Sequence, residues 1–181
     1  MSKEKSQSDR KSLFKVLIYI MIILAIMSIV WLLPRIALGT YTPFFSVSSE
    51  SMAPTLNVGD YIVVKAEPFD NLNVGDIIVF YSPWKSNDII VHRIYDIRIY
   101  DGEKVLITKG DNNYTNPEPD PWYVKKEHYI GKYTGFKIPY LGYLALFFPY
   151  PVNYLLIVFI IVMIFIMELS YRKNEKEDNY N

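Results

Sequence analysis

The stretch DIIVHRIYDIRIY, from Asp88 to Tyr100, decides the fold class of this chain. Its apolar residues alternate with polar ones over a long span, which is typical of a β-strand with one buried face. Asp101 and Gly102 follow, and EKVLITKG (103–110) then resumes the strand-like pattern. An Asp-Gly pair between two such runs is a strong signal for a β-hairpin. The stretch therefore predicts a long two-stranded hairpin.

Similar runs on both sides extend this hairpin into a domain. YIVVKA (61–66) and IIVFYS (77–82) each come directly after a Gly-Asp pair, and HYIGKYTGF (128–136) suggests a closing strand. The main irregular loop, rich in Asn and Pro, is NNYTNPEPDPW (112–122). Because long helical periodicity is missing here, we expect a mainly β fold over residues 39–140, either an all-β sandwich or a partly closed barrel.

Two apolar segments flank that domain. Residues 16–33 carry no charge, and at about 1.5 Å per residue they nearly cross a hydrocarbon core roughly 30 Å thick. Near the other end, no charged residue occurs between Lys137 and Glu168. We therefore expect transmembrane helices over residues 16–38 and 141–168. The alternative for the first segment is a cleaved signal peptide, but its apolar run is longer than usual, and the only small residues that could form a cleavage signal after it, Ala37 and Gly39, are weakly placed.

The charges beside the two segments predict a topology. Lysine and arginine precede the first segment and follow the second, in the tails 1–15 and 169–181. Such positive flanks are typical of cytoplasmic segments. We therefore expect both termini in the cytoplasm and the β domain on the outer or lumenal side. The predicted location is the cell membrane, or the endoplasmic-reticulum membrane in a eukaryote, as a multi-pass protein in contact with the lipid bilayer.

Composition narrows the function further. The chain has 181 residues and a formal net charge of zero, so it has no general attraction for nucleic acid. The absence of cysteine excludes disulfides, thiol catalysis and Cys-ligated zinc. Only His92 and His128 supply imidazole, and no cluster of histidines or carboxylates has the spacing of a zinc site. A Gly-rich phosphate loop is also missing. We expect neither a cofactor nor a metal.

Four serines occur within the six positions of SVSSES (46–51), soon after the first apolar segment. Serine favours turns because it hydrogen-bonds its own backbone. It can also act as a nucleophile when a neighbouring base takes its proton. His92 is a candidate base: it shares a strand face with Ile90 and Ile94, and partial burial there favours the neutral imidazole. A lone strand histidine is more often structural, so the local pattern leaves both possibilities open.

The order of several motifs favours the catalytic interpretation. SESMAPTLNVGDYIVV, GDIIVFYSP, IIVHRI and ITKGDNN resemble, in order and spacing, the successive conserved boxes of the type I signal peptidases. Bacterial members carry a lysine base in the third box, whereas this chain has His92 followed by Arg93, which is similar to the archaeal and endoplasmic-reticulum branch. The resemblance implies a membrane-bound serine endopeptidase that removes signal peptides from preproteins after small residues. It also implies a secretion translocon or accessory subunits as partners.

The same resemblance implies roles for five residues. Ser51 is the expected nucleophile and His92 the general base. Ser49 is expected to help the Ser51 N–H hold the developing oxyanion. Asp120 is the preferred partner of His92, and Asp111 is expected to support the site.

Other polar residues near these motifs are less suited to catalysis. Glu118 lies near Asp120 in sequence, and Glu50 replaces the Gly often found between the two serines, its carboxylate expected in solvent. Lys65 matches no base-bearing box and His128 lacks a motif, so we expect both to be structural. Asn113 begins a glycosylation sequon, a type of short motif that often occurs by chance.

Two rival functions remain at this stage. A LexA-like regulatory protease has a related catalytic domain, but two membrane anchors and a histidine base disfavour it. A non-catalytic membrane adaptor would use the β domain to bind a partner, yet such a module needs neither Ser51 nor His92.

Overall fold

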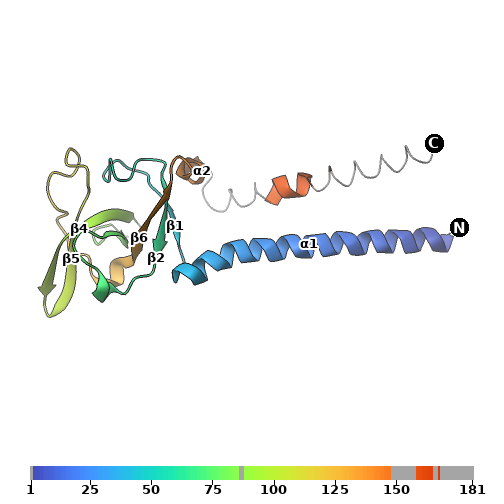
Figure 1. Cartoon of the computed structure of the whole chain (residues 1–181), viewed down its shortest axis with the longest axis horizontal. Coiled ribbons are helices and arrows are strands. Elements are labelled where there is room, and N and C mark those ends of the chain that lie inside the picture. Colours follow the sequence, from blue (N-terminus) through green and yellow to red (C-terminus); the bar gives the residue numbers. More distant parts are fainter. Residues whose placement is uncertain (1, 86–87, 148–157, 165–166, 168–181) are drawn as a thin grey trace.

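A computed structural model of the chain describes residues 2–85, 88–147, 158–164 and 167. A long helix is followed by a β domain with six strands and one short helix (Figure 1). The helices are α1 (Ser2–Leu38) and α2 (Gly142–Phe147). The strands are β1 (Phe44–Ser46), β2 (Tyr61–Lys65), β3 (Ile77–Tyr81), β4 (Ile89–Tyr100), β5 (Glu103–Lys109) and β6 (Tyr129–Ile138). Short 3-10 turns cover Phe69–Asn71 and Lys126–His128.

The strands form one antiparallel sheet in the order β1-β2-β6-β3-β4-β5. The mainly β prediction is confirmed, and so is the β4–β5 hairpin, whose turn residue Asp101 has φ 52 and Gly102 has φ 78. Of the two arrangements expected, a sandwich or a partly closed barrel, the two-sheet sandwich is wrong, since all six strands belong to one hydrogen-bonded sheet. β1 was not predicted because it is only three residues long and lies beside the serine-rich turn.

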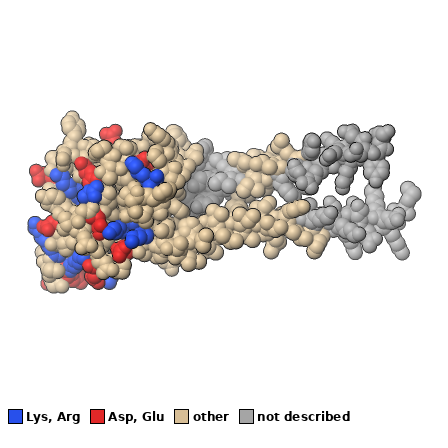
Figure 2. All heavy atoms as spheres, viewed as in Figure 1, with Lys and Arg blue, Asp and Glu red and all other residues tan. Residues whose placement is uncertain are grey.

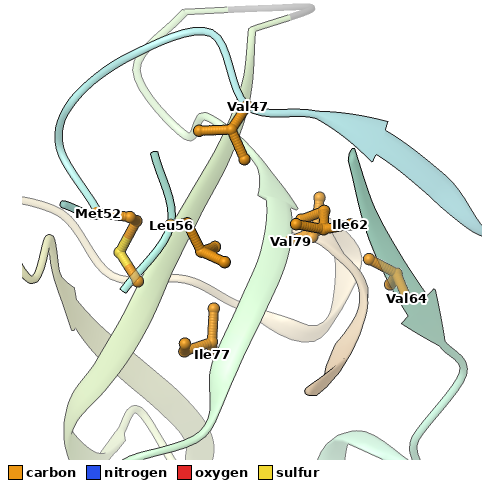
Figure 3. Packing of buried hydrophobic residues seen from close by; sticks show 7 residues of the cluster. All are labelled: Val47, Met52, Leu56, Ile62, Val64, Ile77 and Val79. Carbon is orange, nitrogen blue, oxygen red and sulfur yellow. The ribbon is translucent and has the colours of Figure 1, made fainter. Parts of the chain in front are cut away.

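Strand β3 is central because both of its faces are buried. Ile77 and Val79 pack into one apolar cluster, while Ile78 and Phe80 pack into another on the opposite face. Successive side chains of a strand point to opposite faces, so the unbroken apolar run of β3 supplies both clusters. Figure 3 shows the first cluster, in which side chains of β2 and β3 pack against side chains from the segment between β1 and β2. The segment supplies Val47, Met52 and Leu56, β2 supplies Ile62 and Val64, and β3 supplies Ile77 and Val79.

Helix α1 projects away from the sheet (Figure 1). Its residues Ile18–Leu38 have a mean hydropathy of 2.3 and none of that window is buried, so within the described residues α1 alone is long and apolar enough to cross a membrane. Figure 2 shows acidic and basic side chains interspersed over the β domain, whereas the part of α1 drawn in colour is almost free of them. The first predicted transmembrane segment thus coincides with a continuous apolar helix.

The predicted second transmembrane segment, 141–168, lies partly outside the described residues. Residues 158–164 are helical, and α2 occupies the first part of the predicted span. The Gly142 N–H donates to the Gly59 carbonyl at 2.9 Å, and a side chain added at Gly59 would collide with the Tyr143 ring. The beginning of that span is therefore packed on the β domain.

The end of α1 is attached to the sheet. Gly39, with φ +65, ends the helix, and the Ala66 N–H donates to the Leu38 carbonyl at 2.7 Å. Two residues earlier on β2, the Val64 N–H donates to the Pro43 carbonyl at 2.8 Å. These bonds join the end of α1 and the residues after it to β2 and to Ala66, the residue that follows this strand.

Candidate active site

Ser51 lies on the segment between β1 and β2, and this segment is held by buried neighbours. Met52 and Leu56 are 1% and 0% exposed in the first apolar cluster. The Leu56 N–H donates to the Met52 carbonyl at 2.8 Å, and the Ala53 N–H donates to the Glu50 carbonyl at 3.0 Å. Burying the side chain next to Ser51 therefore fixes the serine in a tight turn at the surface of the core.

His92 lies in β4, paired with Ile78 of β3, and is 5% exposed. Its face of the strand carries Ile94 and Ile90, as the alternation predicted, and both contribute to the second apolar cluster. One ring nitrogen, Nδ1, lies 2.7 Å from Oδ2 of Asp120. This contact leaves Nε2 as the ring nitrogen available for other chemistry.

Asp120 reaches His92 from the loop that follows β5. Its N–H donates to the Thr108 carbonyl at 2.8 Å, and the Thr108 hydroxyl donates to Asp120 Oδ2 at 2.6 Å. Thr108 is fully buried and pairs with Ile94, so it lies on the same face of the sheet as His92. The Asp120 side chain is only 6% exposed. Two hydrogen bonds with Thr108 of β5 therefore hold the Asp120 carboxylate against the His92 imidazole.

Asp111 has a different partner. Its two carboxylate oxygens accept hydrogen bonds from Arg93 Nε at 2.8 Å and from the terminal Arg93 nitrogen at 2.6 Å. The third Arg93 contact runs to the Gly75 carbonyl at 2.7 Å. Burial opposes the ionised form of Asp111, but the guanidinium and the Thr55 hydroxyl hold the pKa of this carboxyl below its usual value. The same bond raises the pKa of Arg93. Asp111 is thus bonded to Arg93 and not to His92.

The two serines predicted to act together are close. Ser49 Oγ lies 3.2 Å from Ser51 Oγ. Glu50, between them, is exposed, as expected. Ser49, Ser51, His92 and Asp120 all line one cavity of about 490 Å³. The structure therefore gathers four of the five predicted site residues around a single hollow.

Large and polar side chains to which the sequence assigned no catalytic role complete this cavity. Phe45 and Trp122 form parts of its wall, and Asn116 lies beside Ser51. Thr108 and Asn112, which belong to the ITKGDNN box, and Asn116, which follows it, hydrogen-bond within the site, but the sequence assigned none of them a role. Trp122 follows Asp120 in the irregular loop, where no periodicity indicates orientation.

The remaining candidates lie elsewhere. Lys65 forms an ion pair with Glu67 at 2.7 Å, and His128 lies in the 3-10 turn before β6, 3.9 Å from the Glu127 carboxylate. Neither lines the cavity, nor does Glu118. Asn113 is exposed and lines a separate hollow beside Arg93 and Asp111. Among the described residues, no group of three or more His, Asp or Glu side chains could hold a metal ion.

Comparison with known proteins decides the family. Residues 13–133 match the family described as signal peptidase, peptidase S26. The chain belongs to this family. It is accordingly a signal peptidase, a serine endopeptidase that cleaves signal peptides. This identification rules out both the regulatory protease and the adaptor as its principal function.

Relatives come from both eukaryotes and bacteria. The signal peptidase complex catalytic subunit SEC11C of Homo sapiens is 32% identical over 145 residues, which is 76% of this chain and 73% of the relative. The SEC11 subunit of Candida tropicalis is 28% identical over 121 residues, 64% of this chain and 71% of the relative. Signal peptidase I W of Bacillus subtilis is 38% identical over 95 residues, 52% of this chain and 47% of the relative. The predicted similarity to the endoplasmic-reticulum branch of this peptidase family is confirmed.

Proposed function

We propose that this signal peptidase cleaves its substrates with Ser51 as nucleophile and His92 as general base. Ser51 Oγ attacks the scissile carbonyl while His92 Nε2 accepts the hydroxyl proton. His92 then gives that proton to the leaving amine, and a water molecule, deprotonated by the same nitrogen, hydrolyses the acyl-enzyme. The chemistry needs no metal or cofactor.

One observation carries this proposal. The 2.7 Å contact between His92 Nδ1 and Asp120 Oδ2 is buried, and Ser51 lines the same cavity as both residues. A carboxylate on Nδ1 selects the tautomer that keeps Nε2 free to take a proton, and it stabilises the imidazolium that forms. Asp120 therefore orients the base. Asp111 acts indirectly. It forms a bidentate ion pair with Arg93, the residue next to His92, and so holds that residue in place.

Two donors are available for the oxyanion. The Ser49 hydroxyl lies beside Ser51 Oγ, and the Ser51 N–H is used by no acceptor among the described residues. Donors aimed at the developing negative charge each contribute a few kcal/mol to stabilisation of the transition state. We assign both groups to this role.

The cavity supports a preference for small residues before the cleaved bond. Its floor and walls include Val47, Met52 and Ile90, with Phe45 and Trp122 as the bulkiest members. We infer that these large rings narrow the part of the cavity that binds the residues before the cleaved bond, so that small side chains fit there best. The substrates are preproteins that carry signal peptides, and we extend to this chain the assembly with partner subunits that the name of its SEC11C relatives implies.

The proposed topology combines α1 with the predicted second span. Both termini lie in the cytoplasm, the span 141–168 returns the chain, and the β domain over 39–140 lies on the outer or lumenal surface of the membrane, partly closed over its core. A translocon delivers the substrates. The positive tails 1–15 and 169–181 support this orientation.

The test uses the full-length protein purified in detergent with a signal-peptide-bearing preprotein. Ser51→Ala and His92→Ala should each abolish release of the mature protein while thermal unfolding stays close to that of the wild type. Lys65→Ala serves as the control, because Lys65 lies outside the cavity and should leave cleavage unchanged. Cleavage by Ser51→Ala at the wild-type rate would refute the mechanism.

A further inference from the structure

Two loops from distant parts of the sequence meet at Ser51. The Asn112 N–H donates to the Ser51 carbonyl at 2.9 Å, and Asn112 Nδ2 donates to the Glu50 carbonyl at 3.0 Å. The Tyr114 N–H donates to Asn112 Oδ1 at 3.0 Å, which fixes the orientation of the carboxamide. One side chain and its own backbone thus hold both carbonyls that flank the nucleophile.

The close approach of these loops requires Gly110. A Cβ at this position would lie 2.5 Å from the Ser51 carbonyl oxygen and 2.8 Å from the Asn116 side chain. The Asn116 N–H in turn donates to the Asn112 carbonyl at 2.7 Å. The loop after β5 therefore packs so closely against the turn that carries Ser51 that position 110 has no space for a Cβ.

Holding the Glu50 carbonyl has a consequence for the next amide. A peptide unit is planar and trans, so its C=O and N–H point in opposite directions. The Glu50 carbonyl accepts from both Asn112 Nδ2 and the Ala53 N–H, and these two bonds fix the plane. The Ser51 N–H belongs to the same plane and is directed away from Asn112. Ser51 lines the cavity, whereas Asn112 does not.

We propose that Asn112 is a positioning residue that aims the Ser51 N–H at the oxyanion of the reaction. The inference rests on the proposed function, in which Ser51 is the nucleophile and its N–H stabilises the transition state. Such a donor is effective only when its direction is set before charge develops. Asn112 supplies this preorganisation from outside the cavity, without contact with the substrate.

The decisive variant is Asn112→Asp. It keeps the shape, the backbone N–H and the acceptor for Tyr114, but it replaces the donor facing the Glu50 carbonyl by an oxygen. We expect kcat to fall about 10- to 100-fold and KM to stay within about twofold. The control Asn113→Asp adds the same charge one residue away, on an exposed side chain that makes no hydrogen bond in the described structure, and should leave kcat unchanged.

A second measurement separates positioning from a merely structural role. A substrate-like peptide aldehyde forms a tetrahedral adduct that carries the oxyanion, whereas a peptide with a reduced scissile bond does not. Asn112→Asp should weaken inhibition by the aldehyde by about the same factor as kcat, while binding of the reduced peptide is unchanged. If the aspartate variant is unstable, Asn112→Ser takes its place with the same expected results.

The outcomes are distinguishable. Wild-type kcat in the Asn112 variant, an equal loss in Asn113→Asp, or an equal loss of reduced-peptide binding would each overturn the positioning role. Failure of the proposed function shows itself elsewhere, as cleavage by Ser51→Ala.

Discussion

At the scale of single residues, one carboxylate oxygen serves two neighbours. Asp120 Oδ2 accepts from the Thr108 hydroxyl at 2.6 Å and contacts His92 Nδ1 at 2.7 Å. The threonine bond fixes the oxygen before the histidine takes up a proton. Asp111, by contrast, uses both of its oxygens on Arg93. The two aspartates are thus built for different tasks, and their amide variants should differ.

Asp120→Asn should lower kcat severely. Loss of the orienting carboxylate of a Ser-His-Asp triad costs about four orders of magnitude in turnover, because the wrong tautomer is favoured. The amide keeps the shape, so KM and the unfolding temperature should change little. Steady-state kinetics with calorimetry checks this. A dead Asp111→Asn beside an active Asp120→Asn would require the two roles to be exchanged.

Asp111→Asn should act mainly on stability, with a smaller effect on rate. The pKa of Asp111 is lowered in the folded state, so its contribution is complete above the unfolded value of about 3.9 and is lost as the pH falls through the lower folded pKa. Near pH 7 the variant should be less stable by about 1 to 2 kcal/mol. Thermal unfolding between pH 7 and pH 3 should show this difference shrinking below about pH 4. A difference that stays constant over that range would contradict the assignment.

At the scale of elements, β6 secures the segment that carries the nucleophile. Lys137 Nζ donates to the Thr55 carbonyl at 3.0 Å and to Asp60 Oδ2 at 2.6 Å. Asp60 is 4% exposed and also accepts from the Asn57 N–H at 2.9 Å. One ammonium thereby holds the end of the Ser51 turn to the neighbouring strand.

Lys137→Met should destabilise the domain by about 2 kcal/mol, because it leaves the Asp60 carboxylate buried without its cation. Since the affected contacts lie on the Ser51 segment, kcat should fall as well. Lys65→Met is the matched control: its ion pair with Glu67 is partly exposed, at 42% and 22% of the two side chains, so stability should stay within about 0.5 kcal/mol. Urea unfolding and cleavage assays measure both effects. Equal stability of the two variants would show that the Lys137 bonds contribute nothing.

The sequence predicted the bounds of the strands better than it predicted which strands pair with one another. Alternation and Gly-Asp turns located β2 to β6 within two residues at each end, because these signals are local. The insertion of β6 between β2 and β3 depends on pairs that lie 49 to 77 residues apart in the sequence, from Phe80–Tyr129 to Tyr61–Ile138, and no local pattern encodes such pairs. The same holds in the site. Motif order indicated Ser51 and His92, but the bonds of Asn112 to the serine turn arise only from packing.

At the scale of the whole molecule, the apolar surface of α1 and the mixed charge of the β domain divide the protein into two environments (Figure 2). A membrane-embedded helix and a water-exposed domain account for this division. The charged tails predict which side of the membrane the β domain occupies, and this prediction can be measured directly.

Single-cysteine labelling should find the β domain outside and the tails inside. The chain has no cysteine, so each introduced thiol reports one position. Glu103→Cys is suitable because that side chain is 70% exposed, whereas the Lys104 ammonium is occupied by the Phe69, Asp70 and Leu72 carbonyls. An impermeant maleimide should label Glu103→Cys in intact cells, and Lys5→Cys only after permeabilisation. The opposite pattern would invert the topology.

The bond between Leu38, the last residue of α1, and Ala66, the residue after β2, fixes where the β domain begins relative to the apolar helix. In the proposed topology, where α1 crosses the membrane, the bond from the Ala66 N–H to the Leu38 carbonyl sets the height of the catalytic cavity above the lipid. A preprotein anchored in the same bilayer by its own apolar segment can present only those bonds whose tether reaches this height. The position of cleavage along a signal peptide then depends on the distance of the peptide bond from the membrane as well as on side-chain size. A signal peptide whose segment between the membrane and that bond is too short is not cleaved, even where its side chains fit the cavity.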